Sequence, residues 1–223
     1  MNATEAKAVA TRQRRTQAER REEAERLILD AAIRIVAEKG LDAFTLADAG
    51  EAAGYSRGLP AHYFRSKAEL LSAITNYIRE WFFAGLRARV GNQHRGLSSL
   101  IAGIDFYFDA CGADRTMLLA LHTVLAGALH KPALADAVAR LNRESAEAIE
   151  VAILNGIASG EIHRDIDAKA WSVLLLASVR GVIAQWLIDP GHVDLPSLRD
   201  GVVASLKGNL AIGTGRAFGR KSK

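Results

Sequence analysis

The chain has 223 residues, of which 49% are hydrophobic and 24% are charged, and its formal net charge is +4. This length can bury one large core, or a small domain together with a medium one. The single cysteine, Cys111, excludes an internal disulfide framework, and the charged N-terminal stretch lacks the apolar region of a secretory signal. We therefore expect a cytoplasmic protein.

Basic residues gather near both ends of the chain, whereas the long middle stretch contains more acidic than basic residues; the basic ends include Arg12, Arg14, Arg15, Arg220 and Lys221. Basic arms on a mildly acidic body suit a polyanionic partner. The alternative is that they only keep the protein in solution. We interpret residues 1–19 as a basic flexible arm and residues 213–223 as a disordered basic tail.

Helical signals follow one another along the whole remaining sequence. Apolar residues recur at helical spacing, and Ser, Thr, Asp, Gly and Pro punctuate the segments at positions typical of helix ends. We predict helices over 20–39, 45–53, 56–64, 67–90, 97–110, 114–131, 133–158, 167–188 and 194–213. The predicted fold is all-α, with an N-terminal three-helix domain over 20–66 and a larger helical domain over 67–212, of which 67–90 is a connecting helix.

Two short helices joined by a tight turn occupy residues 45–64, TLADAGEAAGYSRGLPAHYF. Thr45 with Asp48 forms an acidic capping box, Gly54 supplies the turn, and Ser56 is placed to cap the second helix. This arrangement is typical of a helix-turn-helix, whose second helix enters the major groove of DNA.

The segment over residues 40–71 resembles the DNA-binding domain of the TetR/AcrR family. The matches at fixed spacing are Gly40, Thr45, Ala53-Gly54, Ser56, Gly58, Tyr63-Phe64, Ser66-Lys67, Leu70 and Leu71. The resemblance implies a homodimeric transcriptional regulator, usually a repressor, that releases a near-palindromic double-stranded DNA operator when a small molecule binds. The sequence departs from the family pattern at Ala49, Tyr55, Pro60 and Ala61. Pro60 implies either a distorted first turn of the second helix or a helix that begins at Pro60.

The resemblance places Thr45, Tyr63 and Lys67 at DNA phosphates. We predict Arg57 and His62 at base edges or in the groove, where arginine is the commonest partner of guanine. Gly58 would permit close approach of the backbone, and Tyr55 and Ser56 complete the predicted DNA-binding set. The alternative for Arg57 is an ordinary solvated arginine.

The segment 167–188 is apolar around nearly its whole circumference, so it must bury two faces. We expect Val173, Leu176, Ala177, Ile183, Ala184 and Leu187 to face their own subunit. In the resembled family the last two long helices form the dimer interface, which predicts a dimer contact through Trp171, Leu174, Ser178, Val182, Gln185, Trp186, Leu198, Val202 and Leu206. A membrane span is the alternative, and Arg180 near its centre argues against it.

A ligand pocket is expected among the middle helices, where apolar and aromatic residues surround a few polar groups. The candidates are Trp81, Phe82, Phe106, Tyr107, Cys111, Met117, Leu121, His122, Leu125 and Asn155. The scarcity of charge there suggests a mostly apolar effector. No phosphate-binding glycine loop, metal-ligand spacing or nucleophile motif is present. We therefore expect no enzyme activity, cofactor or metal, and keep an architectural DNA-binding protein without an effector as the alternative.

Overall fold

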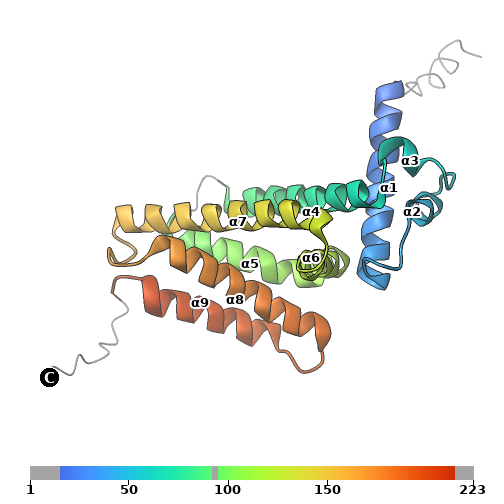
Figure 1. Cartoon of the computed structure of the whole chain (residues 1–223). Helices are drawn as coiled ribbons and strands as arrows, with labels where there is room; N and C mark the ends of the chain where they lie inside the picture. The colour runs from blue at the N-terminus through green and yellow to red at the C-terminus, as the bar shows by residue number, and fades with distance from the viewer. Residues whose placement is uncertain (1–15, 92–94, 214–223) are drawn as a thin grey trace, which may run out of the picture.

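The structure is a computed structural model that describes residues 16–91 and 95–213. Nearly all of the predicted flexible arm (1–15) and of the predicted tail (214–223) lies outside the described residues. Within the described residues the chain forms nine α-helices (Figure 1): α1 (Gln17–Lys39), α2 (Leu46–Ala52), α3 (Pro60–Tyr63), α4 (Lys67–Val90), α5 (Leu97–Ala113), α6 (Arg115–Gly127), α7 (Pro132–Ser159), α8 (Ala168–Ile188) and α9 (Leu195–Leu210). The predicted all-α fold is confirmed.

The first helix begins three residues before its predicted start because the chain supplies a capping box there. The Thr16 hydroxyl accepts a hydrogen bond from the Glu19 amide at 3.2 Å, and the Glu19 carboxylate accepts one from the Thr16 amide at 2.7 Å. Its first turns are exposed, whereas Ile28, Ala32 and Val36 are buried. The buried half of α1 packs against α2, α4 and α6.

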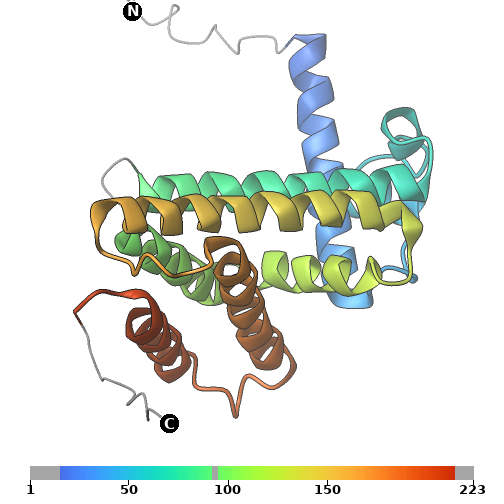
Figure 2. The ribbon, with the colours of Figure 1, turned by 60° about the vertical axis from the view of Figure 1, so that its left-hand side comes forward.

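The head consists of α1, α2 and α3 at one end of the molecule, and the body consists of α4–α9 (Figure 1). Helix α4 continues from the head into the body and lies alongside α7 in both views (Figure 2). Leu70, Ile74, Ile78 and Phe82 recur every fourth residue on α4, and all four are buried. This stripe joins the core of the head to the core of the body without interruption.

Helices α8 and α9 lie on the outer side of the body, where α8 packs against α7 and α5 (Figure 1). The stripe that α8 buries contains Ser172, Leu175, Leu176, Val179, Ile183 and Leu187. Val173 and Ala177, which we expected to face their own subunit, are instead exposed. That expectation was wrong because an all-apolar helix has no polar face to indicate how it is rotated about its axis.

Helix α8 is also the one described helix that is long and apolar enough to cross a membrane by length and composition. A third of that apolar stretch is buried within the fold. Near its middle, the Arg180 guanidinium donates to the Tyr107 hydroxyl at 3.3 Å and to the side-chain oxygen of Asn142. The charge that argued against a membrane span therefore joins α8 to α5 and α7.

Candidate DNA-binding face and effector pocket

Helix α2 begins at the predicted capping box. The Thr45 hydroxyl accepts a hydrogen bond from the Asp48 amide at 3.2 Å and donates one to the Asp48 carboxylate at 2.8 Å. The Asp48 carboxylate also accepts a hydrogen bond from the Thr45 amide at 2.9 Å. The bonds that the Thr45 hydroxyl and amide donate lower the pKa of Asp48, so the carboxylate stays charged at the positive end of the helix. After α2, Gly54 adopts a φ of 79°, a left-handed conformation that glycine adopts without strain.

The second helix of the motif is short and begins at Pro60. The backbone before it is held by turns of the i to i−3 kind, from the Leu59 amide to the Ser56 carbonyl and from the Ala61 amide to the Gly58 carbonyl. Leu59 stands at the N-cap without a side-chain hydrogen bond, so the predicted cap by Ser56 was wrong. Proline at the first helical position lacks only an amide that would be unpaired there, which explains this late start.

Helices α2 and α3 approach closely where Gly50 meets Pro60. A Cβ atom on Gly50 would lie 2.7 Å from the Ser56 carbonyl oxygen and 2.8 Å from Cδ of Pro60. Pro60 is buried, so its ring fills the space that the missing side chain of Gly50 leaves. Sequence reasoning did not identify this pair. The departure from the family pattern at Pro60 is thus accommodated by the glycine opposite.

Arg57, Gly58 and His62 are exposed on the outer side of the motif, together with Ser56. The Arg57 guanidinium donates to the Glu51 carboxylate at 2.7 Å, and both side chains are about two-thirds exposed. An exposed pair of this kind contributes little to stability, so it can exchange for another partner. Nothing lies within 4 Å of a Cβ atom placed on Gly58, so the protein itself does not require glycine there.

The other predicted DNA-binding residues are partly held by the fold. Tyr55 and Tyr63 are half-buried against the core of the head, and the Arg21 guanidinium lies 5.8 Å from the centre of the Tyr63 ring. The Lys67 ammonium group donates to the Asp42 carbonyl at 3.1 Å and lies 5.0 Å from the centre of the Phe44 ring. Lys67 therefore also joins the first turn of α4 to the loop that precedes α2.

Contacts between head and body are concentrated around α1. The Tyr77 hydroxyl on α4 donates to the Asp30 carboxylate on α1 at 2.8 Å, and burial and this neighbour raise the pKa of Tyr77. Lys131, just before α7, pairs with Asp42 in the α1–α2 loop. A Cβ atom on Gly127 of α6 would clash with Leu41. Helices α4 and α6 and the start of α7 are therefore all in direct contact with α1 or the loop that follows it.

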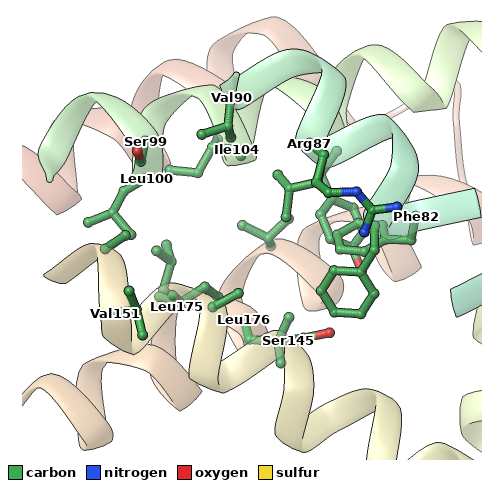
Figure 3. A pocket seen from close by; sticks show the side chains of 18 of the residues that line it. Phe82, Arg87, Val90, Ser99, Leu100, Ile104, Ser145, Val151, Leu175 and Leu176 are labelled. Carbon is green, nitrogen blue, oxygen red and sulfur yellow. The ribbon is translucent and has the colours of Figure 1, made fainter. Parts of the chain in front are cut away.

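The body contains an apolar cavity of about 550 Å³ between α4, α5, α7 and α8 (Figure 3). Its walls include Phe82, Leu86 and Val90 of α4, Leu100 and Ile104 of α5, Ile149 and Val151 of α7, and Leu175 and Val179 of α8. This volume lies within the range of cavities that hold small-molecule ligands.

Of the predicted pocket residues, Phe82, Tyr107 and Asn155 line this cavity. Cys111, Met117 and Leu121 are buried in the core, and Leu125 packs against it. Trp81 and Phe106 pack together, with ring centres 5.9 Å apart. The prediction took aromatic and polar residues in apolar stretches as the signal, whereas most of the wall is aliphatic and recurs at helical spacing like any core stripe.

His122 on α6 is the other polar residue that the sequence singled out. Its Nε2 atom is buried and has no hydrogen-bond partner among the described residues. Burial, together with the nearby charge of Arg180, lowers the pKa of His122 to about 4. The imidazole is therefore neutral near pH 7, which is the form that a largely buried site favours.

Six of the residues predicted for a dimer contact line one groove of about 240 Å³ between α8 and α9: Trp171, Leu174, Ser178, Leu198, Val202 and Leu206. Leu206 lies at the bottom of this groove and is only 2% exposed, because it packs inside its own subunit. Gln185 is exposed farther along α8, where Val182 and Trp186 are half-buried. The Arg115 guanidinium lies 5.7 Å from the centre of the Trp186 ring.

Two family models match the chain. The one described as "Bacterial regulatory proteins, tetR family" matches residues 28–74, and the one described as "BetI-type transcriptional repressor, C-terminal" matches residues 98–211. Among curated proteins, the HTH-type transcriptional regulator CymR of Pseudomonas putida is 31% identical over 177 residues, which cover 78% of this chain and 84% of that protein.

Solved structures show the same fold. A TetR-family transcriptional regulator from Rhodococcus sp. has a TM-score of 0.74 and 26% identity, over 83% of this chain and 97% of that one. A transcriptional regulator from Saccharomonospora viridis in complex with choline has a TM-score of 0.77 and 20% identity, over 86% and 99%. With its helix-turn-helix, its helical body and these matches over both, the chain belongs to the TetR family of bacterial transcriptional regulators.

Proposed function

We propose that this regulator is a repressor that binds a near-palindromic operator as a homodimer and leaves it when a small, mostly apolar effector enters the body. The observation that carries the proposal is the combination of an exposed helix-turn-helix face with an apolar cavity lined by the helix that leaves the head. The proposed units are the head, residues 20–66, for DNA and the body, residues 67–212, for the effector and the second subunit.

The exposed side of the motif supports the DNA assignment. Arg57 and His62 are free of the core and able to reach base edges, while Thr45, Tyr63 and Lys67 suit phosphates around them. Tyr55 and Ser56 flank this set. Arg57 would exchange the Glu51 carboxylate for DNA, since both members of that pair are exposed.

The outer helices support the dimer. Val173 and Leu174 on α8 and Leu198 on α9 are between 38% and 57% exposed, so a second subunit would remove apolar surface from water. A two-fold dimer would also hold two helix-turn-helix motifs at half-sites one DNA turn, about 34–36 Å, or a multiple apart. Residues proposed at this contact are Trp171, Leu174, Ser178, Val182, Gln185, Trp186, Leu198 and Val202.

Helix α4 supports the switch. Its first turn holds Lys67 in the head, Tyr77 contacts α1, and Phe82, Leu86 and Val90 line the cavity. An effector that prefers one position of α4 would shift the populations of two arrangements of the head. The architectural alternative needs no cavity, so the cavity favours the effector-controlled regulator. A repressor binds DNA without transforming it, which supports a cytoplasmic location and no catalysis.

The first experiment measures binding of the purified full chain to duplex DNA from the region beside its own gene, at several salt concentrations. We expect tight binding to an inverted repeat, with affinity that falls steeply as salt rises. Protection of a single asymmetric half-site would contradict the dimeric operator. Absence of any salt-sensitive affinity for duplex DNA would overturn the proposed function.

A second experiment tests Arg57 as a base-contacting residue. Arg57→Ala should cost about 1–3 kcal/mol on the operator and much less on random DNA. This change also leaves the Glu51 carboxylate without its partner, and an unpaired negative charge could itself repel DNA. The matched controls are therefore Glu51→Gln alone and Glu51→Gln combined with Arg57→Ala, because both lack that carboxylate. Equal losses on operator and random DNA would show that Arg57 contacts only the DNA backbone.

A further inference from the structure

The wall of the α4–α5–α7–α8 cavity carries charge of only one sign among its described residues. Its charged members are Arg87 on α4 and Arg95 just before α5, and the others are apolar or neutral. Figure 3 shows the Arg87 side chain beside Phe82 on one side of the cavity. Both arginines are exposed, so they stand at the rim while the interior is apolar.

Neither guanidinium has a carboxylate partner in the described part of the chain, although several acids lie on the neighbouring elements. These acids bind other groups: Asp109 pairs with Arg89 at 2.9 Å, Glu144 with Arg79 at 2.8 Å, and the Glu161 carboxylate accepts from the Leu97 amide at 3.0 Å. Glu147 and Glu150 on α7 do not line the cavity. The positive rim is therefore not neutralised from within the described fold.

We propose that the effector of this cavity is an apolar molecule that carries a single anionic group of the carboxylate class, which pairs with Arg87 and Arg95. This inference rests on the proposed function, in which the cavity is the effector site. The guanidinium fork matches a carboxylate with paired charge-assisted hydrogen bonds. The aliphatic walls bury the body of the molecule, which supplies the larger share of the affinity.

The same wall selects against cationic amphiphiles. Phe82, Phe83 and Tyr107 do line the cavity and could contact a quaternary ammonium group. The wall offers no carboxylate to pair with it, however, and its charge would be repelled by the two arginines. Neutral molecules of the same length would enter the cavity but would gain nothing from the rim. A test should therefore vary the charge of the ligand's polar group while its hydrocarbon chain stays the same.

The test measures binding of decanoate, decanol and decyltrimethylammonium to the full-length protein by titration calorimetry below their aggregation concentrations. We expect decanoate to bind roughly tenfold or more tightly than decanol, which corresponds to about one charge-assisted hydrogen bond. Decyltrimethylammonium should bind more weakly than either. Decanoate should also lower the affinity of the protein for its operator.

The variant Arg87→Gln/Arg95→Gln should lose the preference for decanoate over decanol and keep its affinity for decanol. Arg89→Gln is the matched control, because Arg89 lies on the same helix, pairs with Asp109 and does not line the cavity. Tighter binding of the cation, equal binding of decanoate and decanol, or an unchanged preference in the double variant would overturn the inference. If no probe binds while operator binding is intact, the inference fails and the DNA-binding function stands.

Discussion

His122 is a histidine that burial keeps neutral, and this makes it a source of pH dependence. Its folded pKa is about 4, below the ordinary value of 6.5. Between these two values the unfolded chain binds a proton that the folded protein does not. The contribution to stability is therefore present above pH 6.5 and is lost as the pH falls towards 4.

We expect the free energy of unfolding to fall by about 2 kcal/mol more between pH 7 and pH 5 in the wild-type protein than in His122→Gln. Chemical denaturation at the two pH values measures this difference. His130→Gln, which replaces an exposed histidine, should behave like the wild type. An identical pH dependence in His122→Gln and the wild type would show that His122 is not held neutral.

At the scale of the element, the helix-turn-helix depends on a glycine opposite a proline. The ring of Pro60 occupies the space beside Gly50, and this lets α3 lie against α2 although α3 spans only Pro60–Tyr63. Tyr63 and Phe64 also hold this short helix against the core of the head. Together with them, the Gly50–Pro60 pair orients the exposed residues Arg57 and His62.

The corresponding prediction concerns Gly50→Ala. A Cβ atom there meets the Ser56 carbonyl and Pro60, so α3 must shift; overpacking costs about 1–3 kcal/mol, of which the better helix propensity of alanine offsets up to about 1 kcal/mol. We expect a lower melting temperature and a large loss of DNA affinity, measured by thermal unfolding and operator titration.

Gly58→Ala is the matched control for that experiment. The space around Gly58 is open, so the melting temperature should stay unchanged. Operator affinity should still fall, because a side chain there would keep the DNA at a distance. If Gly50→Ala were as stable and bound DNA as tightly as the wild type, the close contact would not shape the motif.

At the scale of the whole molecule, the head, helix α4 and helices α8 and α9 share one continuous hydrophobic core. The core runs without a break from Ile28 through Ile74 to Ile104 and Val179. A change in the cavity can therefore reach the head only by moving packed helices. In the proposed dimer, the same change would alter the separation of the two DNA-binding motifs.

The dimer contact is tested by Leu174→Asp. Leu174 is 55% exposed on α8, so the substitution is tolerated in the monomer but places a charge in the proposed interface. We expect a shift from dimer to monomer in analytical ultracentrifugation and a loss of operator affinity. Leu129→Asp, at an even more exposed leucine near the end of α6, should leave the dimer intact. A dimeric Leu174→Asp would place the interface elsewhere.

The sequence was enough to predict most of the helices and to identify the family, although it placed the start of the second helix of the motif too early. Helix caps depend only on residues a few positions apart, so they can be recognised in the sequence. The structure contains three helices that begin at such caps: Thr45 with Asp48, Ser66 with Glu69, and Asp167. The spacing of the motif between Gly40 and Leu71 was sufficient to identify a TetR-type head, because those residues satisfy short-range requirements of the turn and its caps.

The surfaces that face one another could be identified only from the packed helices. The rotation of α8 was undetermined because it is apolar all around, so Val173 and Ala177 were assigned to the wrong face. The wall of the cavity was largely missed because four helices contribute to it, and its aliphatic residues have the spacing of ordinary core. The pairing of Gly50 with Pro60 depends on how two helices cross. Periodicity and caps act within a few residues, whereas these features arise from packing between segments far apart in the chain.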